Sequence, residues 1–312
     1  MASSPIINVI DVAFVRFNAP DLDRMEAFLV DFGLIRSERT DDTLYMRGTD
    51  DEGFIHVTHL AEEPGFAGLA FNAESTDDLE TLSLAEGFSD VTGLDGPGGG
   101  RVVSTADPNG FRVEVVAGRG SVGRLDVGRQ SVTNDGTTTD RKGAPLRVDP
   151  GPSQVKRLGH VVLEVHDFSE SEAWYKKRFG LVTSDEVALK DDSTLGAFLR
   201  CDAGERFVDH HTLFLINAGK ASFNHAAYEV ANLDDLMAGH THLTMSDRKH
   251  QWGIGRHLLG SQVYDYWYDP YDHALEHWTD GDLFNNNTPP NTATTAELMS
   301  SQWGPTHSTP GL

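Results

Sequence analysis

Side chains able to bind a metal or transfer a proton are concentrated in the second half of the chain. Of the 14 histidines, only His56 and His59 precede residue 150. Two of the later histidines, His160 and His225, and the carboxylate of Glu276 lie in short apolar runs that are typical of β-strands. Because side chains alternate faces along a strand, three strands of one curled sheet can direct two imidazoles and a carboxylate to one point. Two histidines and one carboxylate form the ligand set of non-haem Fe(II) oxygenases, although zinc, manganese or nickel can use similar ligands.

An internal duplication supplies the elements that would position these residues. Three segments of the first half recur in the second half at offsets of 147, 157 and 162 residues: 12–17 at 159–164, 68–71 at 225–228, and 107–110 at 269–272. The first segment of each copy is followed by an amphipathic helix that ends at Gly33 or Gly180, and Ser169 with Glu172 forms a possible capping box at the start of the second helix. Each copy therefore predicts a βαβββ unit used twice.

The predicted fold class is α+β, with two tandem domains of paired βαβββ modules. The predicted boundaries are 1–118 for the first domain, 119–155 for a linker, 156–284 for the second domain and 285–312 for a polar tail, extended or partly disordered. The Asp-Pro-Asn-Gly turn at 107–110 and the glycine-rich run at 96–100 predict hairpins in the first copy.

The two copies differ where a metal would bind. In our alignment Ala13, Gly68 and Glu114 of the first copy correspond to His160, His225 and Glu276 of the second. A single histidine on an apolar strand is most often a core residue. Three matched positions that are all able to bind a metal in one copy only are harder to explain in that way. We therefore expect a metal site inside the curled sheet of the C-terminal domain and none in the N-terminal domain.

Composition excludes several classes of partner. The chain has 48 acidic and 25 basic residues, a net charge of −23, which argues against binding to nucleic acid or to an anionic membrane. No apolar run is long enough for a transmembrane helix, and the N-terminus lacks the pattern of a signal peptide. The single cysteine, Cys201, excludes an intramolecular disulfide. We expect a soluble cytoplasmic protein.

A family signature overlaps the predicted metal site. The stretch Gly255-Arg256-His257, then Tyr266, Asp269-Pro270 and Glu276, resembles the signature of the type I extradiol ring-cleavage dioxygenases of the vicinal oxygen chelate superfamily. The family usually has an apolar residue where Asp265 stands and a glycine or proline where Asp272 stands. The resemblance covers both copies, and it implies a metal in the C-terminal domain only.

The resemblance also implies a ligand set and catalytic residues. The metal, Fe(II) with Mn(II) as a possibility, would be held by His160, His225 and Glu276. The catalytic residues would be His211, which exchanges protons with a catechol, and His257 and Tyr266, which donate hydrogen bonds to substrate oxygens. The implied reaction is extradiol cleavage of a catechol by O2 to a ring-opened semialdehyde or keto acid.

The remaining histidines carry no predicted role. His210 should point to the opposite side of a strand from His211 and is expected at the surface or in an interface. No function is assigned to the other seven: His166, His240, His242, His250, His273, His277 and His307.

The substrate pocket is predicted from aromatic residues, and the candidates are Phe198, Phe207, Phe223, Tyr228, Trp252 and Trp267. The only cations near the signature are Arg256 and, farther away, the Arg248-Lys249 pair. A catechol with an apolar substituent or a second ring is therefore favoured over a carboxylated one.

Two further functions remain open. A lyase, isomerase or epimerase of the same superfamily would use a divalent metal to stabilise an enolate, but has no evident need for His211, His257 and Tyr266. A binding protein of the same fold would not need the metal ligands. By analogy with the family, a homo-oligomer is expected.

Overall fold

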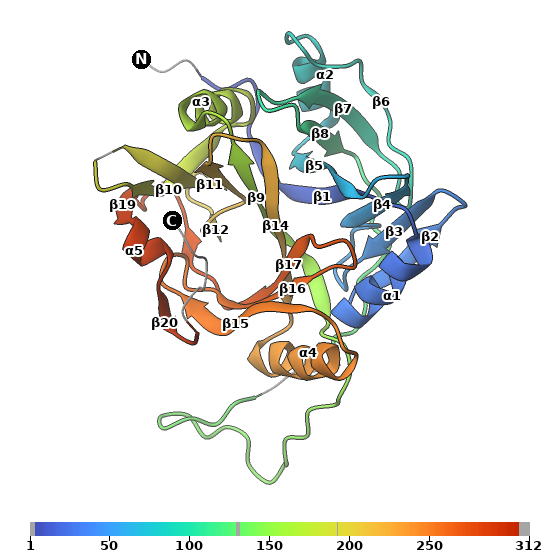
Figure 1. Cartoon of the computed structure of the whole chain (residues 1–312), viewed down its shortest axis with the longest axis vertical. Helices are drawn as coiled ribbons and strands as arrows, with labels where there is room; N and C mark the ends of the chain where they lie inside the picture. Colours follow the sequence, from blue (N-terminus) through green and yellow to red (C-terminus); the bar gives the residue numbers. More distant parts are fainter. Residues whose placement is uncertain (1–3, 129–131, 192, 306–312) are drawn as a thin grey trace.

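Two curled β-sheets, one from each half of the chain, organise the structure, a computed structural model that describes residues 4–128, 132–191 and 193–305 (Figure 1). The first half contains β1 (Val9–Ala19), α1 (Leu22–Phe32), β2 (Ile35–Arg39), β3 (Thr43–Arg47), β4 (His56–Leu60), β5 (Gly65–Ala73), α2 (Thr76–Ser83), β6 (Thr92–Gly93), β7 (Arg101–Ala106) and β8 (Arg112–Ala117). Its strand order is β2-β3-β4-β1-β5-β8-β7-β6.

The second half repeats this plan with additions. Its elements are β9 (Val155–Val165), α3 (Phe168–Phe179), β10 (Leu181–Ala188), β11 (Thr194–Cys201), β12 (Val208–Asp209), β13 (Leu213–Asn217), β14 (Ser222–Val230), α4 (Leu233–Met245), β15 (His250–His257), β16 (Val263–Tyr268), β17 (Ala274–Thr279), β18 (Leu283–Phe284), β19 (Asn291–Thr294), α5 (Thr295–Leu298) and β20 (Ser301–Trp303). The main sheet runs β19-β10-β11-β13-β9-β14-β17-β16-β15-β20, and β12 pairs with β18 separately.

Each sheet consists of two βαβββ modules, as the duplication predicted. The modules of the first half join where β1 pairs antiparallel with β5, and those of the second half join where β9 pairs antiparallel with β14. The α+β class is confirmed, and β6–β7 and β7–β8 form the two expected hairpins.

The strand register corrects our alignment of the copies by one residue. Ala227 pairs with His160, whereas Ala70, its counterpart in the first copy, pairs with Phe14. Phe14 is therefore the counterpart of His160, and Ala13 is the extra residue of a bulge between the pairs Val12–Phe71 and Phe14–Ala70. An apolar run does not reveal a bulge, so the sequence comparison chose the wrong offset.

Helix α3 begins earlier than predicted. Its N-cap is Asp167, whose side chain accepts a hydrogen bond from the Glu170 amide, so the capping box proposed for Ser169 and Glu172 is wrong. The predicted ends are confirmed: Gly33 and Gly180 terminate α1 and α3 with φ of 105° and 69°, which are left-handed values that glycine adopts readily.

The C-terminal segment is not a loose tail in its described part. Strand β19 adds to β10 at one edge of the second sheet, β20 adds to β15 at the other edge, and α5 connects them. Of the two expected states, extended or partly disordered, residues 291–303 take the extended one in β19 and β20, and the disordered alternative is wrong for them. Polar composition misled the prediction of disorder, because an edge strand buries few of its side chains. The final residues of the tail, including His307, lie outside the described residues.

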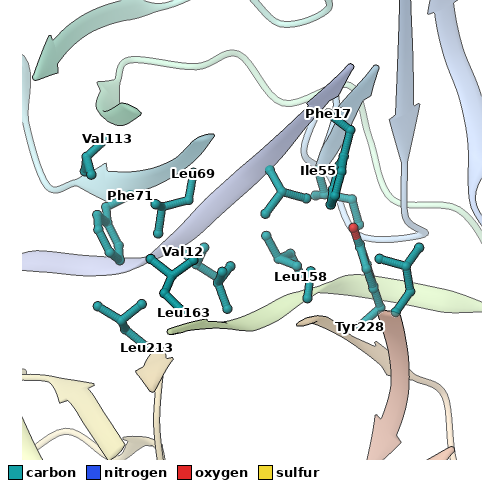
Figure 2. Close-up of a cluster of buried hydrophobic side chains, with 14 of the residues drawn as sticks. Val12, Phe17, Ile55, Leu69, Phe71, Val113, Leu158, Leu163, Leu213 and Tyr228 are labelled. Atoms are coloured by element: carbon teal, nitrogen blue, oxygen red, sulfur yellow. The ribbon is translucent and has the colours of Figure 1, made fainter. Parts of the chain in front are cut away.

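The two halves share one apolar core. Figure 2 shows Val12, Leu69 and Phe71 of the first sheet facing Leu158 and Leu163 of the second, and all five side chains are buried. The strands that carry the centre of each sheet, β1 and β9, thus lie back to back. A helix long and apolar enough to cross a membrane is absent from the described residues.

Candidate metal centre

Three neighbouring strands of the second sheet bring the predicted ligands together. His160 lies on β9, His225 on β14 and Glu276 on β17, which are adjacent in the strand order. One Glu276 carboxylate oxygen, Oε2, lies 3.3 Å from His160 Nε2 and 3.4 Å from His225 Nε2. One ligand atom from each residue lies within 4.8 Å of the other two. The structure therefore assembles the three residues as the sequence predicted.

The chemistry of this cluster fits a divalent cation. The Glu276 side chain is fully buried, yet neither carboxylate oxygen has a hydrogen-bond partner among the described residues, and the same holds for His225 Nε2. A buried carboxylate without hydrogen bonds is destabilising by several kcal/mol unless a cation compensates it. Two of these atoms, Glu276 Oε2 and His225 Nε2, lie 3.4 Å apart, as two ligands of one ion would.

The ionisation of the three ligands suits the same role. Burial opposes ionisation of Glu276, but the surrounding imidazoles of His160, His225 and His257 hold its pKa well below the usual range. Burial lowers the pKa of His160, which keeps that imidazole neutral. His225 Nδ1 lies 2.8 Å from the Asn224 side-chain oxygen, so Nδ1 carries the proton and Nε2 is left as the metal-binding atom.

The equivalent place in the first sheet is closed to a metal. Phe14 and Gly68 occupy the positions of the two histidines, and Arg16 forms an ion pair of 2.5 Å with Glu114. The guanidinium supplies the positive charge that an ion would supply in the second sheet.

The three predicted catalytic residues surround the metal ligands. The ring centroids of His211 and His160 are 4.0 Å apart. Tyr266 pairs directly with Glu276 across β16 and β17, and its hydroxyl lies 3.0 Å from His257 Nε2. Burial lowers the pKa of His211 well below 6.5, so this imidazole is neutral near pH 7.

His210 is not at the surface, which corrects our prediction. His210 and His211 lie in a bend before β13, not on a strand, so their side chains do not alternate faces. The His210 side chain is buried, its Nε2 lies 2.6 Å from an oxygen of Asp185, and its Nδ1 lies 3.0 Å from His211 Nδ1. No pattern in the sequence pointed to Asp185, which contacts His210 from β10.

A cavity of about 580 Å³ opens above the metal ligands. Its lining includes His160, His211, His225, His257 and Tyr266, and an apolar wall formed by Val162, Leu195, Phe198, Phe214, Ile216, Leu259, Leu298 and Met299. Polar side chains on its margin are Glu164, Asn217, Lys220, Asn224 and Gln251.

Only Phe198 and Trp252 of the predicted aromatic residues line this cavity. Trp267 is buried on the opposite face of its strand, Phe207 is 61% exposed, and Phe223 and Tyr228 pack toward the first half. Aromatic content alone could not separate these locations, because the face of a strand decides them.

The cations considered for the pocket are engaged elsewhere. Arg256 pairs with Asp280, Arg248 with Asp31, and Lys249 with Asp272.

Most of the other histidines lie away from the cavity. His277 is buried on the far face and contacts the carbonyl oxygen of Phe32 at 2.6 Å, and His273 contacts Asp269. His242 pairs with Asp31 of α1. His240 and His250, which carried no predicted role, both contact Asp265.

The fold defines a structural class. Solved structures of an extradiol dioxygenase and of a glyoxalase share this fold, with paired βαβββ modules in two curled sheets. No family model matches the chain.

Comparison with particular proteins agrees with this class. The chain is 27% identical over 307 residues to metapyrocatechase 2 of Cupriavidus necator. The match covers 97% of this chain and 92% of that protein. Among solved structures, a Mn(II)-bound glyoxalase from Novosphingobium aromaticivorans superposes with a TM-score of 0.79 at 21% identity, over 98% and 97% of the two chains. Homoprotocatechuate 2,3-dioxygenase from Arthrobacter globiformis superposes with a TM-score of 0.76 at 20% identity, over 94% and 87%.

Proposed function

We propose that this chain is an Fe(II)-dependent extradiol dioxygenase that opens the ring of a catechol with O2. The observation that carries the proposal is the buried cluster of His160, His225 and Glu276 at the base of the cavity, with His211 and Tyr266 beside it. The curated relative named metapyrocatechase 2 supports the same reaction class.

The three proposed ligands are compatible with either iron or manganese. Two imidazoles and one carboxylate suit Fe(II), and Mn(II) accepts the same ligands. When bound, such an ion would hold the two catechol oxygens and O2 and allow electrons to pass between them. His160, His225 and Glu276 would hold such an ion, and the cavity that His160 and His225 line would give substrate access to it.

A chain of hydrogen bonds prepares His211 to accept a proton. The Asp185 carboxylate accepts a hydrogen bond from His210 Nε2, and hydrogen bonds from His210 and Asn291 keep the pKa of Asp185 below its usual value despite burial. His210 Nδ1 then accepts from His211 Nδ1. This arrangement leaves the lone pair on His211 Nε2, which can take a catechol proton and later return it.

Tyr266 and His257 are placed to orient substrate oxygens. Both line the cavity, and the hydrogen bond between them fixes the direction of the Tyr266 hydroxyl. Burial and the Glu276 carboxylate raise the pKa of Tyr266 well above 10, so the hydroxyl remains a hydrogen-bond donor. A donor fixed in this way stabilises negative charge that develops on a substrate oxygen.

The cavity favours a catechol with an apolar substituent. Its apolar wall extends from Val162 to Leu298, whereas none of the described lining residues is an arginine. Lys220, the one lysine among the described lining residues, already pairs with Glu164 at 3.3 Å. A carboxylated substituent would therefore lack a dedicated partner, and an alkyl or aryl substituent would bury apolar surface.

The test is anaerobic loading of the full chain with Fe(II), followed by O2 and a panel of catechols. We expect consumption of one O2 per substrate and a yellow ring-opened product. Metal binding without O2 consumption on any catechol would instead favour a metal-dependent lyase, isomerase or epimerase. Failure to bind metal would favour a binding protein.

A further inference from the structure

A second cluster of metal-binding side chains lies on the outer face of the C-terminal sheet. It consists of His240 on α4, His250 on β15 and Asp265 on β16, and one ligand atom of each lies within 4.8 Å of the other two. Asp265 alternates with Tyr266 along β16, so it points away from the cavity and toward α4, which packs against this sheet (Figure 1). The second cluster is therefore separate from the candidate metal centre.

The carboxylate of this cluster is built into the core. Asp265 is 0% exposed, and one of its oxygens, Oδ2, accepts a hydrogen bond of 2.6 Å from the Trp267 indole N–H. His240 Nδ1 lies 3.0 Å from the same oxygen, and His250 Nε2 lies 2.9 Å from the other oxygen. An indole N–H that fixes a carboxylate in this way acts as the outer hydrogen-bond partner that metal-binding carboxylates commonly have.

The first copy of the module shows that the fold does not need a carboxylate at the position of Asp265. Val103 of β7 pairs with Val115, and Asp265 of β16 pairs with His277 at the equivalent place. Val103 is therefore the counterpart of Asp265, and it is a fully buried apolar side chain. The candidate metal centre shows a similar difference, because Phe14 of the first copy stands where the second copy has His160.

We propose that His240, His250 and Asp265 bind a second divalent ion of the zinc class. Two imidazoles and one carboxylate without a thiolate are ligands typical of Zn²⁺, whereas Ca²⁺ and Mg²⁺ prefer sets of oxygen atoms. The side chains of His240 and His250 are 30% and 34% exposed, so the ion can enter from solvent and keep a water ligand. By linking α4 to β15 and β16, the ion would stabilise the outer layer of the C-terminal domain.

The test measures Zn²⁺ bound to the metal-free full chain after removal of excess metal. We expect about two ions per wild-type chain. We expect about one ion in His250→Gln, about one in Glu276→Gln, which disables the first centre, and none in the double variant. His166→Gln, an exposed histidine elsewhere, is the matched control and should bind as the wild type does.

Two further measurements separate metal binding from folding. In Glu276→Gln, Zn²⁺ should raise the thermal midpoint, and Co²⁺ should give the visible absorption of a low-symmetry site with nitrogen ligands. Both effects should vanish when His250→Gln is added. If His250→Gln and Asp265→Asn bind as much Zn²⁺ as the wild type, the cluster is only a hydrogen-bonded network and the proposal is wrong. Neither result depends on dioxygenase activity.

Discussion

At the scale of single residues, the proposed function assigns metal binding and proton transfer to different groups of the candidate site. One ligand atom from each of His160, His225 and Glu276 lies close to the other two. His211 instead packs its ring against the ring of His160, and its Nδ1 forms a hydrogen bond with His210 Nδ1. A change at His211 should therefore affect the chemical step without affecting metal content.

Replacement of His211 by phenylalanine tests this separation. The ring still fills the buried space, but no atom can accept the catechol proton. We expect His211→Phe to bind Fe(II) in the wild-type amount and to lose about 10²- to 10⁴-fold in kcat, the usual contribution of general acid–base catalysis. Elemental analysis and O2 consumption measure the two quantities. Loss of metal together with activity would place His211 among the ligands instead.

Asp185 should act through His210 and His211 as a positioning residue. In Asp185→Asn the amide can either donate to or accept from His210, so the tautomer of His211 is no longer fixed. We expect a decrease in kcat of about 10- to 100-fold with little change in KM and an altered pH profile of kcat.

Asp191→Asn serves as the control for this variant, because Asp191 is an exposed carboxylate that contacts only the nearby Ser193 among the hydrogen bonds of the described residues. An unchanged pH profile in Asp185→Asn would limit Asp185 to a structural role.

At the scale of elements, the C-terminal segment contributes to the substrate cavity. Strands β19 and β20 are anchored to opposite edges of the second sheet, so α5 spans the distance between those edges. Leu298 and Met299, at the end of α5, line the cavity. A segment that is short and polar in sequence thereby supplies part of the apolar wall.

A larger side chain at Leu298 should change substrate preference. We expect Leu298→Trp to lower kcat/KM for catechols with alkyl or aryl substituents by roughly 10-fold or more relative to unsubstituted catechol, because the substituent loses its space. Leu298→Ala should change the ratio in the opposite direction. Competition between paired substrates measures the ratio directly. An equal effect on all catechols would show that the substituent does not lie against α5.

At the scale of the whole molecule, the two halves are joined by polar contacts as well as by the shared core. His56 of β4 and Tyr228 of β14 form a buried hydrogen bond of 2.8 Å, and Arg248 binds Asp31 of α1. Burial lowers the pKa of His56 to about 3, below the 6.5 of a free imidazole. His56 is therefore neutral in the folded protein across the range where it protonates in the unfolded chain.

This difference makes folding depend on pH. Between pH 6.5 and about 3 the unfolded chain binds one more proton at His56 than the folded chain does. The stabilisation is therefore complete above pH 6.5 and decreases as the pH falls, by about 1.4 kcal/mol per pH unit from this residue. In urea unfolding of metal-free protein from pH 7 to 5, His56→Gln should lose stability less steeply. Tyr228→Phe, which retains the imidazole, should keep the wild-type slope, and equal slopes in all three proteins would contradict the assignment.

The sequence by itself determined the class of fold and predicted which three side chains, His160, His225 and Glu276, would lie together. Both follow from patterns of residues that are close together in the chain. Apolar runs and helix ends define the repeated modules. Comparison of the two copies shows that His160 and His225 stand where the first copy has residues that cannot bind a metal. The predicted roles of His211, His257 and Tyr266 rest on the family signature, and the structure brings those residues close to His160 and Glu276.

Only the tertiary structure decided which side chains share a face or a cavity. A one-residue bulge moved the counterpart of His160 from Ala13 to Phe14, and a bend in place of a strand buried His210 against Asp185. Trp267 and Tyr266 are adjacent in sequence but lie on opposite faces of β16. Contacts between residues far apart in the chain depend on strand register and packing, which local patterns of hydrophobicity do not specify.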